Sequence, residues 1–104
     1  MLVEERIYTL YVGKQTEYLQ IYESDGLPVQ RQYLGRMLGY YFTEVGPLNQ
    51  VIHMWGYDSF EDRITRRAAM RADPRWAPYL KKIQPFSLHQ ESKLLFPASF
   101  FKPW

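Results

Sequence analysis

The amino-acid sequence predicts a single α+β domain, residues 1–104, in the order strand, helix, strand, strand, helix, strand. Three observations lead to this prediction. The chain has 104 residues, enough for one domain and too few for two. Segments rich in β-forming residues alternate with segments whose apolar residues recur at helical spacing. Glycine and proline separate these segments, which gives each element a defined end.

The first strand is predicted from Leu2 to Val12, with Gly13 and Lys14 ending it. Successive side chains of a strand point to opposite faces, so Glu4, Arg6 and Tyr8 share one side. Neither side of this strand is purely apolar. We therefore expect one side to face helices and the other to face a wet or partner-filled space.

The segment after this strand predicts two helical pieces. Residues 15–25 carry apolar side chains three and four positions apart, and Gly26 and Pro28 predict the end of that helix. A second, shorter piece is predicted from Val29 to Leu34.

The middle of the chain predicts an antiparallel hairpin. Residues 37–45 and 49–57 are rich in β-branched and aromatic residues, and a short Gly-Pro turn joins them. A second helix follows, with Ser59 and Asp62 resembling a capping box. Phe60 and Ile64 begin its expected inner stripe. Its expected solvated outer side, partly paired with Glu61 and Asp62, carries Arg63, Arg66, Arg67 and Arg71.

The last third of the chain predicts a further helix, a strand and a tail. Asp73 is placed to cap a helix from Arg75 to Ile83, with Pro74 in its first turn. The fourth strand is predicted from Phe86 to Leu95. Residues 96–104 form an aromatic tail, which we expect to dock on its own domain or on a partner.

This order of elements is the ferredoxin-like βαββαβ arrangement, a four-stranded antiparallel sheet with both helical regions on one face. Apolar residues lie on both faces of the predicted strands, and the helices can cover only one. A homodimer, sheet against sheet, would cover the other. The alternative is a monomer whose own tail covers that face.

Composition excludes several classes of function. The net charge is +2, and no concentrated basic stripe suggests nucleic-acid binding. The chain has no Cys, which excludes a disulfide framework and a thiolate site and fits a reducing cytosol. No apolar run reaches the length of a membrane helix and no signal peptide is recognised, so we expect a cytoplasmic protein without membrane insertion.

Metal and cofactor sites are not predicted. His53 and His89, the two histidines, lie on separate predicted strands without a carboxylate at ligand spacing. The sequence also has no glycine-rich phosphate loop and no nucleophile elbow.

Several segments resemble the NIPSNAP family. The opening strand places Glu4, Arg6 and Tyr8 on motif positions, and the stretch from Val51 to Ser59 is the most recognisable. Further matching segments are Gly13-Lys14, Gly35, Gly39–Tyr41, Glu44–Asn49, Arg63–Arg67, Asp73-Pro74 and Trp76. The resemblance implies the dimeric α+β barrel fold, in which two ferredoxin-like subunits enclose a barrel. It implies no known reaction.

His53 is the candidate catalytic residue, because a histidine can act as acid, base or hydrogen-bond donor near neutral pH. It shares a predicted strand face with Trp55 and Tyr57, and the three offer polar groups along one apolar wall, as a ligand pocket requires. In the alternative interpretation His53 is a structural histidine and the aromatic residues are core.

Arg6 and Tyr8 form a second candidate ligand-binding cluster. A buried guanidinium needs a carboxylate, which Glu4 or Glu44 can supply, and Gln90 on the last strand can complete the cavity. In function the arginine would bind an anionic group of a ligand. In the alternative it holds strands or subunits together.

Three functions remain open at this point. The leading one is small-molecule binding in a cleft of the barrel. The second is a cofactor-independent monooxygenase or isomerase, which rests on analogy of fold alone. The third is a protein-interaction module that grips a partner with its aromatic tail.

Overall fold

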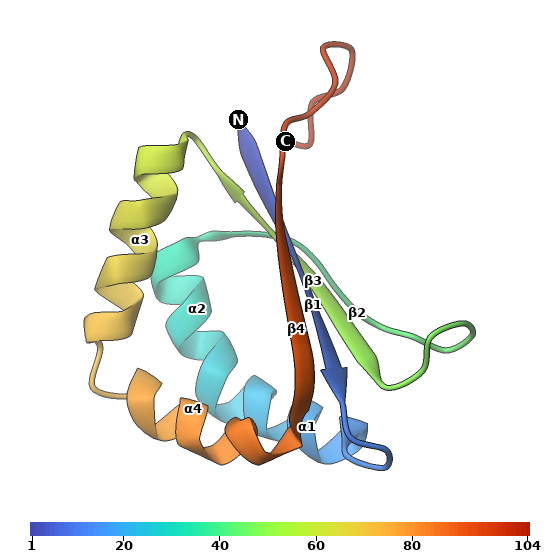
Figure 1. The fold of residues 1–104 in the computed structure, drawn as a ribbon. Helices are drawn as coiled ribbons and strands as arrows, with labels where there is room; N and C mark the ends of the chain where they lie inside the picture. Colours follow the sequence, from blue (N-terminus) through green and yellow to red (C-terminus); the bar gives the residue numbers. More distant parts are fainter.

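The computed structural model describes residues 1–104 and contains the predicted elements in the predicted order (Figure 1). The strands are β1 (Leu2–Leu10), β2 (Arg36–Phe42), β3 (Gln50–Tyr57) and β4 (Ser87–Leu95). The α-helices are α1 (Gln15–Ile21), α2 (Leu27–Leu34), α3 (Phe60–Ala72) and α4 (Trp76–Ile83). A π-helical segment (Tyr22–Gly26) joins α1 to α2, and a 3₁₀ turn (Gln84–Phe86) joins α4 to β4.

The strands form one antiparallel sheet in the order β2-β3-β1-β4, and all helices cover one face of it (Figure 1). This confirms the ferredoxin-like α+β fold. Arg6 of β1 lies directly opposite His53 of β3, and Tyr8 lies opposite Val51. Because residues opposite each other share a face, both candidate clusters are brought to the helix-covered side of the sheet.

The predicted break between the first two helices is wrong. The chain stays helical from Gln15 to Leu34, through the π-helical segment. Pro28 lies in the first turn of α2, where its missing N–H costs no hydrogen bond. Gly26 is needed for packing, since a Cβ there would lie 2.6 Å from the ring of Tyr79.

The start of α3 agrees with the prediction. The Ser59 hydroxyl accepts a hydrogen bond from the backbone N–H of Asp62 at 3.0 Å, and the Asp62 carboxylate accepts one from the N–H of Asp58. The inner face predicted for α3 is wrong, because Phe60 and Ile64 are half exposed while Arg67 is buried.

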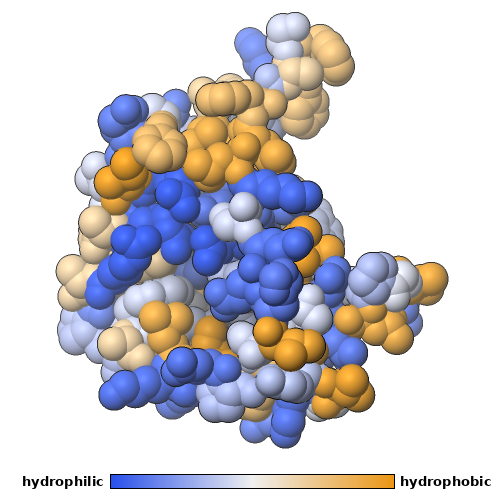
Figure 2. Space-filling model, viewed as in Figure 1, coloured by the Kyte–Doolittle hydropathy of each residue, from blue (hydrophilic) through white to orange (hydrophobic).

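The end of the aromatic tail docks on the domain. The ring of Trp104 packs against Gly56 and lies 4.2 Å from the guanidinium carbon of Arg36. Phe96 and Phe100 remain 85% and 91% exposed. In Figure 1 the tail projects beyond the sheet, and Figure 2 shows hydrophobic residues in this projection. No helix in the chain is both long and apolar enough to cross a membrane.

Candidate functional site

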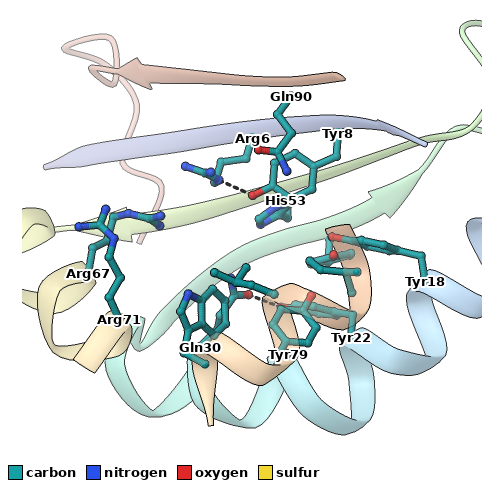
Figure 3. Close-up of a pocket in the computed structure, with 14 residues that line it drawn as sticks. Arg6, Tyr8, Tyr18, Tyr22, Gln30, His53, Arg67, Arg71, Tyr79 and Gln90 are labelled. Atoms are coloured by element: carbon teal, nitrogen blue, oxygen red, sulfur yellow. Dashed lines mark hydrogen bonds between the residues drawn. The ribbon is translucent and has the colours of Figure 1, made fainter. Parts of the chain in front are cut away.

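A cavity of about 250 Å³ lies between the helix-covered face of the sheet and the helices (Figure 3). The strands supply its roof and α1 to α4 its floor and ends. Its lining residues are Arg6, Tyr8, Tyr18, Tyr22, Gln30, Tyr40, His53, Arg67, Arg71, Trp76, Tyr79, Leu80, Ile83 and Gln90. Arg71 and Gln90 are exposed and mark its opening, and Figure 2 shows hydrophilic residues gathered between α3 and β4.

Four of the predicted site residues line this cavity, namely Arg6, Tyr8, His53 and Gln90. The other three do not. Trp55 and Tyr57 are fully buried on the same face of β3 but lie outside the lining. Glu44 is exposed in the connection between β2 and β3, which projects away from the helices (Figure 1). The hairpin turn therefore keeps the carboxylate of Glu44 away from Arg6.

Glu4 is the carboxylate that pairs with Arg6. It is fully buried, and its Oε2 accepts hydrogen bonds from Arg6 Nη1 at 3.3 Å, from Arg63 Nε at 3.1 Å and from the Ser92 hydroxyl at 3.0 Å. Arg67 Nη1 lies 3.5 Å from the other oxygen, Oε1. One carboxylate thus faces three guanidinium groups. Glu4 itself does not line the cavity.

These contacts correct the prediction that the arginines of α3 form a solvated face. Arg63 and Arg67 turn inward to Glu4, and Arg71, one turn further along, lines the cavity. Of the four, Arg66 behaves as predicted, with an ion pair to Asp62 at 2.8 Å. The sequence contains a signal for this arrangement, because residues 63, 67 and 71 recur every four positions and so share one helix face.

The arginines keep Glu4 ionised. Burial alone would raise the pKa of Glu4, but the hydrogen bond from Arg63 and the charges of Arg67 and Arg6 outweigh it, and the pKa is lowered. Burial lowers the pKa of Arg67, and the positive charge of Arg6 lowers it further. With three guanidinium groups and one carboxylate, the cluster carries more positive than negative charge.

His53 is neutral, and its proton has a defined place. Burial lowers its pKa to about 3, and the nearby charge of Arg6 acts in the same direction. The Trp55 indole N–H donates a hydrogen bond to His53 Nδ1 at 2.9 Å. Because an indole nitrogen only donates, Nδ1 must be the acceptor and the ring proton lies on Nε2. Nε2 is buried and has no partner in the protein.

Aromatic rings line the cavity around His53. Tyr40 stacks on the imidazole with 4.8 Å between ring centroids, and Tyr22 stacks on Tyr40 at 4.5 Å. Tyr8 meets His53 edge-on, and its hydroxyl accepts a hydrogen bond from Arg6 Nε at 2.7 Å. Aromatic side chains thus make up much of the cavity wall, which suits an aromatic guest.

Sequence reasoning missed the polar groups that the helices and β2 bring to the cavity. The Tyr40 hydroxyl is buried and unpartnered, as is Arg67 Nε, and Arg71 makes no hydrogen bond or ion pair. The chain holds no group of three His, Asp or Glu side chains placed to bind a metal ion.

Fold and site together define an α+β sandwich protein with a small cavity between sheet and helices. The family model for NIPSNAP matches residues 3–102. The chain therefore belongs to the NIPSNAP family.

Curated relatives agree with this membership. Over 69 residues the chain is 34% identical to a NipSnap homolog from Dictyostelium discoideum, and over 74 residues it is 34% identical to human NipSnap homolog 3A. These matches cover 66% and 70% of the chain. They span only 31% and 29% of the relatives, so the chain matches about a third of the length of each relative.

Solved structures of the family match nearly the whole chain. An uncharacterized NIPSNAP-like domain protein from Burkholderia xenovorans is 48% identical with a TM-score of 0.93, covering 98% of this chain and 89% of that one. A NIPSNAP family protein of unknown function from Agrobacterium tumefaciens is 39% identical with a TM-score of 0.95, covering 100% and 94%. A putative antibiotic biosynthesis monooxygenase from Nitrosomonas europaea shares the fold alone, at 9% identity and a TM-score of 0.68 over 93% and 98% of the two chains.

Proposed function

We propose that this NIPSNAP protein binds a small organic molecule in the cavity between the sheet and the helices. The observation that carries the proposal is that two residues lining the cavity hold buried polar groups without a hydrogen-bond partner, His53 Nε2 and the Tyr40 hydroxyl. Leaving such groups without a partner costs about 1–3 kcal/mol each. A bound molecule that accepts hydrogen bonds from them recovers that cost.

The size and shape of the cavity support the same proposal. Its volume of about 250 Å³ lies just below the usual range of roughly 300–1,000 Å³ for ligand pockets, so the ligand is small. The aromatic side chains among the lining residues favour an aromatic molecule. The proton on His53 Nε2 favours a donor role in binding, and the catalytic role predicted from the sequence stays a prediction.

Calorimetric titration with three bicyclic probes of equal size tests the binding function. The probes are 2-naphthoate, 2-naphthol and 2-naphthylamine. Leu80 lines the cavity at its exposed rim and Lys81, its neighbour on α4, does not line it, so Leu80→Trp is designed to obstruct the cavity while Lys81→Trp is the matched control. We expect at least one probe to bind the natural protein and the Lys81→Trp variant and to lose binding in Leu80→Trp. Absence of binding by all three probes, or equal binding by the Leu80→Trp variant, overturns the proposal.

We further propose that the protein acts as a homodimer that covers the open face of the sheet, the face opposite the helices. The tail covers only one corner of that face, in a hollow lined by Val3, Leu38, Met54, Leu95 and five residues of the tail. Ile7 and Ile52 remain partly exposed and Tyr41 is 57% exposed. A second copy would remove this apolar surface from water.

Sedimentation of the Ile52→Glu variant tests the dimer. Ile52 lies in the middle of the open face, opposite Ile7, so a charge there would be buried in a face-to-face pair. We expect a dimer for the natural chain at micromolar concentration and a monomer for the variant. Lys81→Glu on the outer helix layer is the control, and a natural chain that sediments as a monomer would disprove the proposal.

A further inference from the structure

The two ends of the cavity differ in character, and this difference bears on what it binds. Figure 3 shows Arg67 and Arg71 together at the α3 end, with Arg6 above them, and Tyr18 at the opposite end. Tyr22, Tyr79 and Ile83 also line the cavity, and Figure 3 shows Tyr22 on the side toward Tyr18. The cavity thus has an arginine end and a tyrosine end, with His53 between them.

The arginine end carries a surplus of positive charge. Arg6, Arg63 and Arg67 surround one carboxylate, that of Glu4, which leaves two positive charges unbalanced. Arg71 adds a third charge and has no partner in the protein. No Asp or Glu is among the residues that line the cavity. Like charges this close repel, so an anion bound among them would be favoured.

The polar groups left free in the cavity are mainly donors. His53 Nε2 carries the ring proton, because Nδ1 is occupied by Trp55. The Tyr8 hydroxyl already accepts from Arg6, which leaves its own hydrogen free to donate. The only uncharged acceptors in the wall are amide and hydroxyl oxygens, and the Gln30 oxygen already accepts from the Tyr22 hydroxyl at 2.6 Å. A ligand rich in acceptors fits this wall, and one rich in donors does not.

We propose that the cavity selects a small aromatic carboxylate, with the carboxylate at the arginine end and the ring against the tyrosines. A planar carboxylate matches the two-pronged guanidinium geometry. His53 donates from Nε2 to an oxygen of the ligand midway along the cavity. This inference rests on the proposed binding function and specifies the chemical class of the ligand.

The three naphthalene probes separate this inference from the binding function itself. They have the same ring system and differ in one substituent, which is an anionic carboxylate, an uncharged hydroxyl that donates and accepts hydrogen bonds, or an uncharged amine that mainly donates them. We expect 2-naphthoate to bind at least about tenfold more tightly than 2-naphthol, and 2-naphthylamine to bind no better than 2-naphthol. If 2-naphthol or 2-naphthylamine binds as tightly as 2-naphthoate, the cavity binds small molecules but the carboxylate inference is wrong. If none binds, the binding function itself fails.

The Arg71→Gln variant locates the carboxylate. Arg71 makes no ion pair and is exposed at the opening, so its loss leaves the Glu4 cluster intact and the fold unaffected. We expect affinity for 2-naphthoate to fall about tenfold and affinity for 2-naphthol to stay within twofold. Arg31→Gln, on α2 and outside the cavity lining, removes the same charge and should change neither. An Arg71→Gln variant with unchanged affinity for 2-naphthoate overturns the placement of the anion at the arginine end.

Discussion

The two faces of strand β1 both carry charged and apolar side chains, but they differ in how the charges are buried and paired. The face under the helices carries Glu4 and Arg6, and the glutamate is fully buried. The face without helices carries Val3 and Ile7. Alternation normally places apolar side chains inside and charges outside. Here the charges of Glu4 and Arg6 lie under the helices beside the buried Leu2 and Leu10, whereas the open face, where we propose that a second subunit docks, carries Glu5 beside Val3 and Ile7.

Burial alone therefore does not separate structural from functional residues in this sheet. The polar groups under the helices are connected in one network that runs from Glu4 through the arginines to Tyr8. On the open face the cross-strand polar contact is an isolated pair, Gln50 and Thr9, at 3.3 Å. Substitutions in the network should therefore lower the free energy of unfolding much more than equivalent substitutions on the open face.

The largest expected effect comes from Glu4→Gln. The change removes the one charge that balances three guanidinium groups, and breaking a buried ion pair costs about 3–5 kcal/mol. Urea unfolding at pH 7 measures the loss. Glu5→Gln, one residue further on the open face, makes no ion pair and should stay within about 0.5 kcal/mol. Equal losses of stability in the two variants would show that the charged residues of the two faces contribute equally to folding.

The pH dependence of unfolding sharpens the comparison through His53. In the unfolded chain its imidazole takes up a proton near pH 6.5, whereas in the folded protein the pKa is lowered to about 3. The unfolded state binds more protons between these values, so stability falls as the pH is lowered from 6.5. The loss approaches about 1.4 kcal/mol per pH unit, roughly 1.5 kcal/mol between pH 6.5 and 5.

His53→Gln should remove this slope, and its amide oxygen can still accept from Trp55. His89→Gln, on exposed strand β4, should retain it. Urea unfolding at pH 7, 6 and 5 gives the slopes. An unchanged slope in His53→Gln would mean that the imidazole is not buried in its neutral form.

A smaller change, a gain in stability, is expected for Tyr40→Phe. The change removes a buried hydroxyl without a protein partner, so the free protein should gain about 1 kcal/mol in stability. Tyr41→Phe is the matched control, because Tyr41 is the next residue of β2 and its side chain is 57% exposed. Thermal unfolding compares the two, and a loss of stability in Tyr40→Phe would contradict the absence of a partner.

The smallest effect is expected for Thr9→Val on the open face. The change preserves shape and removes the acceptor of the Gln50 side chain, in a pair that is partly exposed to water. Such cross-strand pairs contribute roughly 0.2–1 kcal/mol, and the high strand propensity of valine offsets part of the loss. Urea unfolding should show a change below about 0.5 kcal/mol, and a loss above 2 kcal/mol would place this pair among the important contacts.

Much of the site on the strands could be predicted, and little of the site on the helices. Alternation along β1 and β3 correctly placed Arg6, Tyr8 and His53 on one face, because a strand repeats every two residues. The helix α3 was assigned the wrong face. Its apolar residues Phe60 and Ile64 indicated an inner stripe, yet the buried charge of Glu4 draws the arginines inward instead.

The sequence by itself determined the order of the elements, the α+β fold and the two faces of each strand. These follow from local patterns of turn residues and from periodicity, which act over a few positions. The tertiary structure alone decided that Glu4 pairs with Arg63, 59 positions away, and that Tyr40 joins His53 in the cavity wall. The first contact depends on how a helix packs across the sheet, and the second on the register between β2 and β3, which shifts between Met37 and Gly39. No local pattern specifies either.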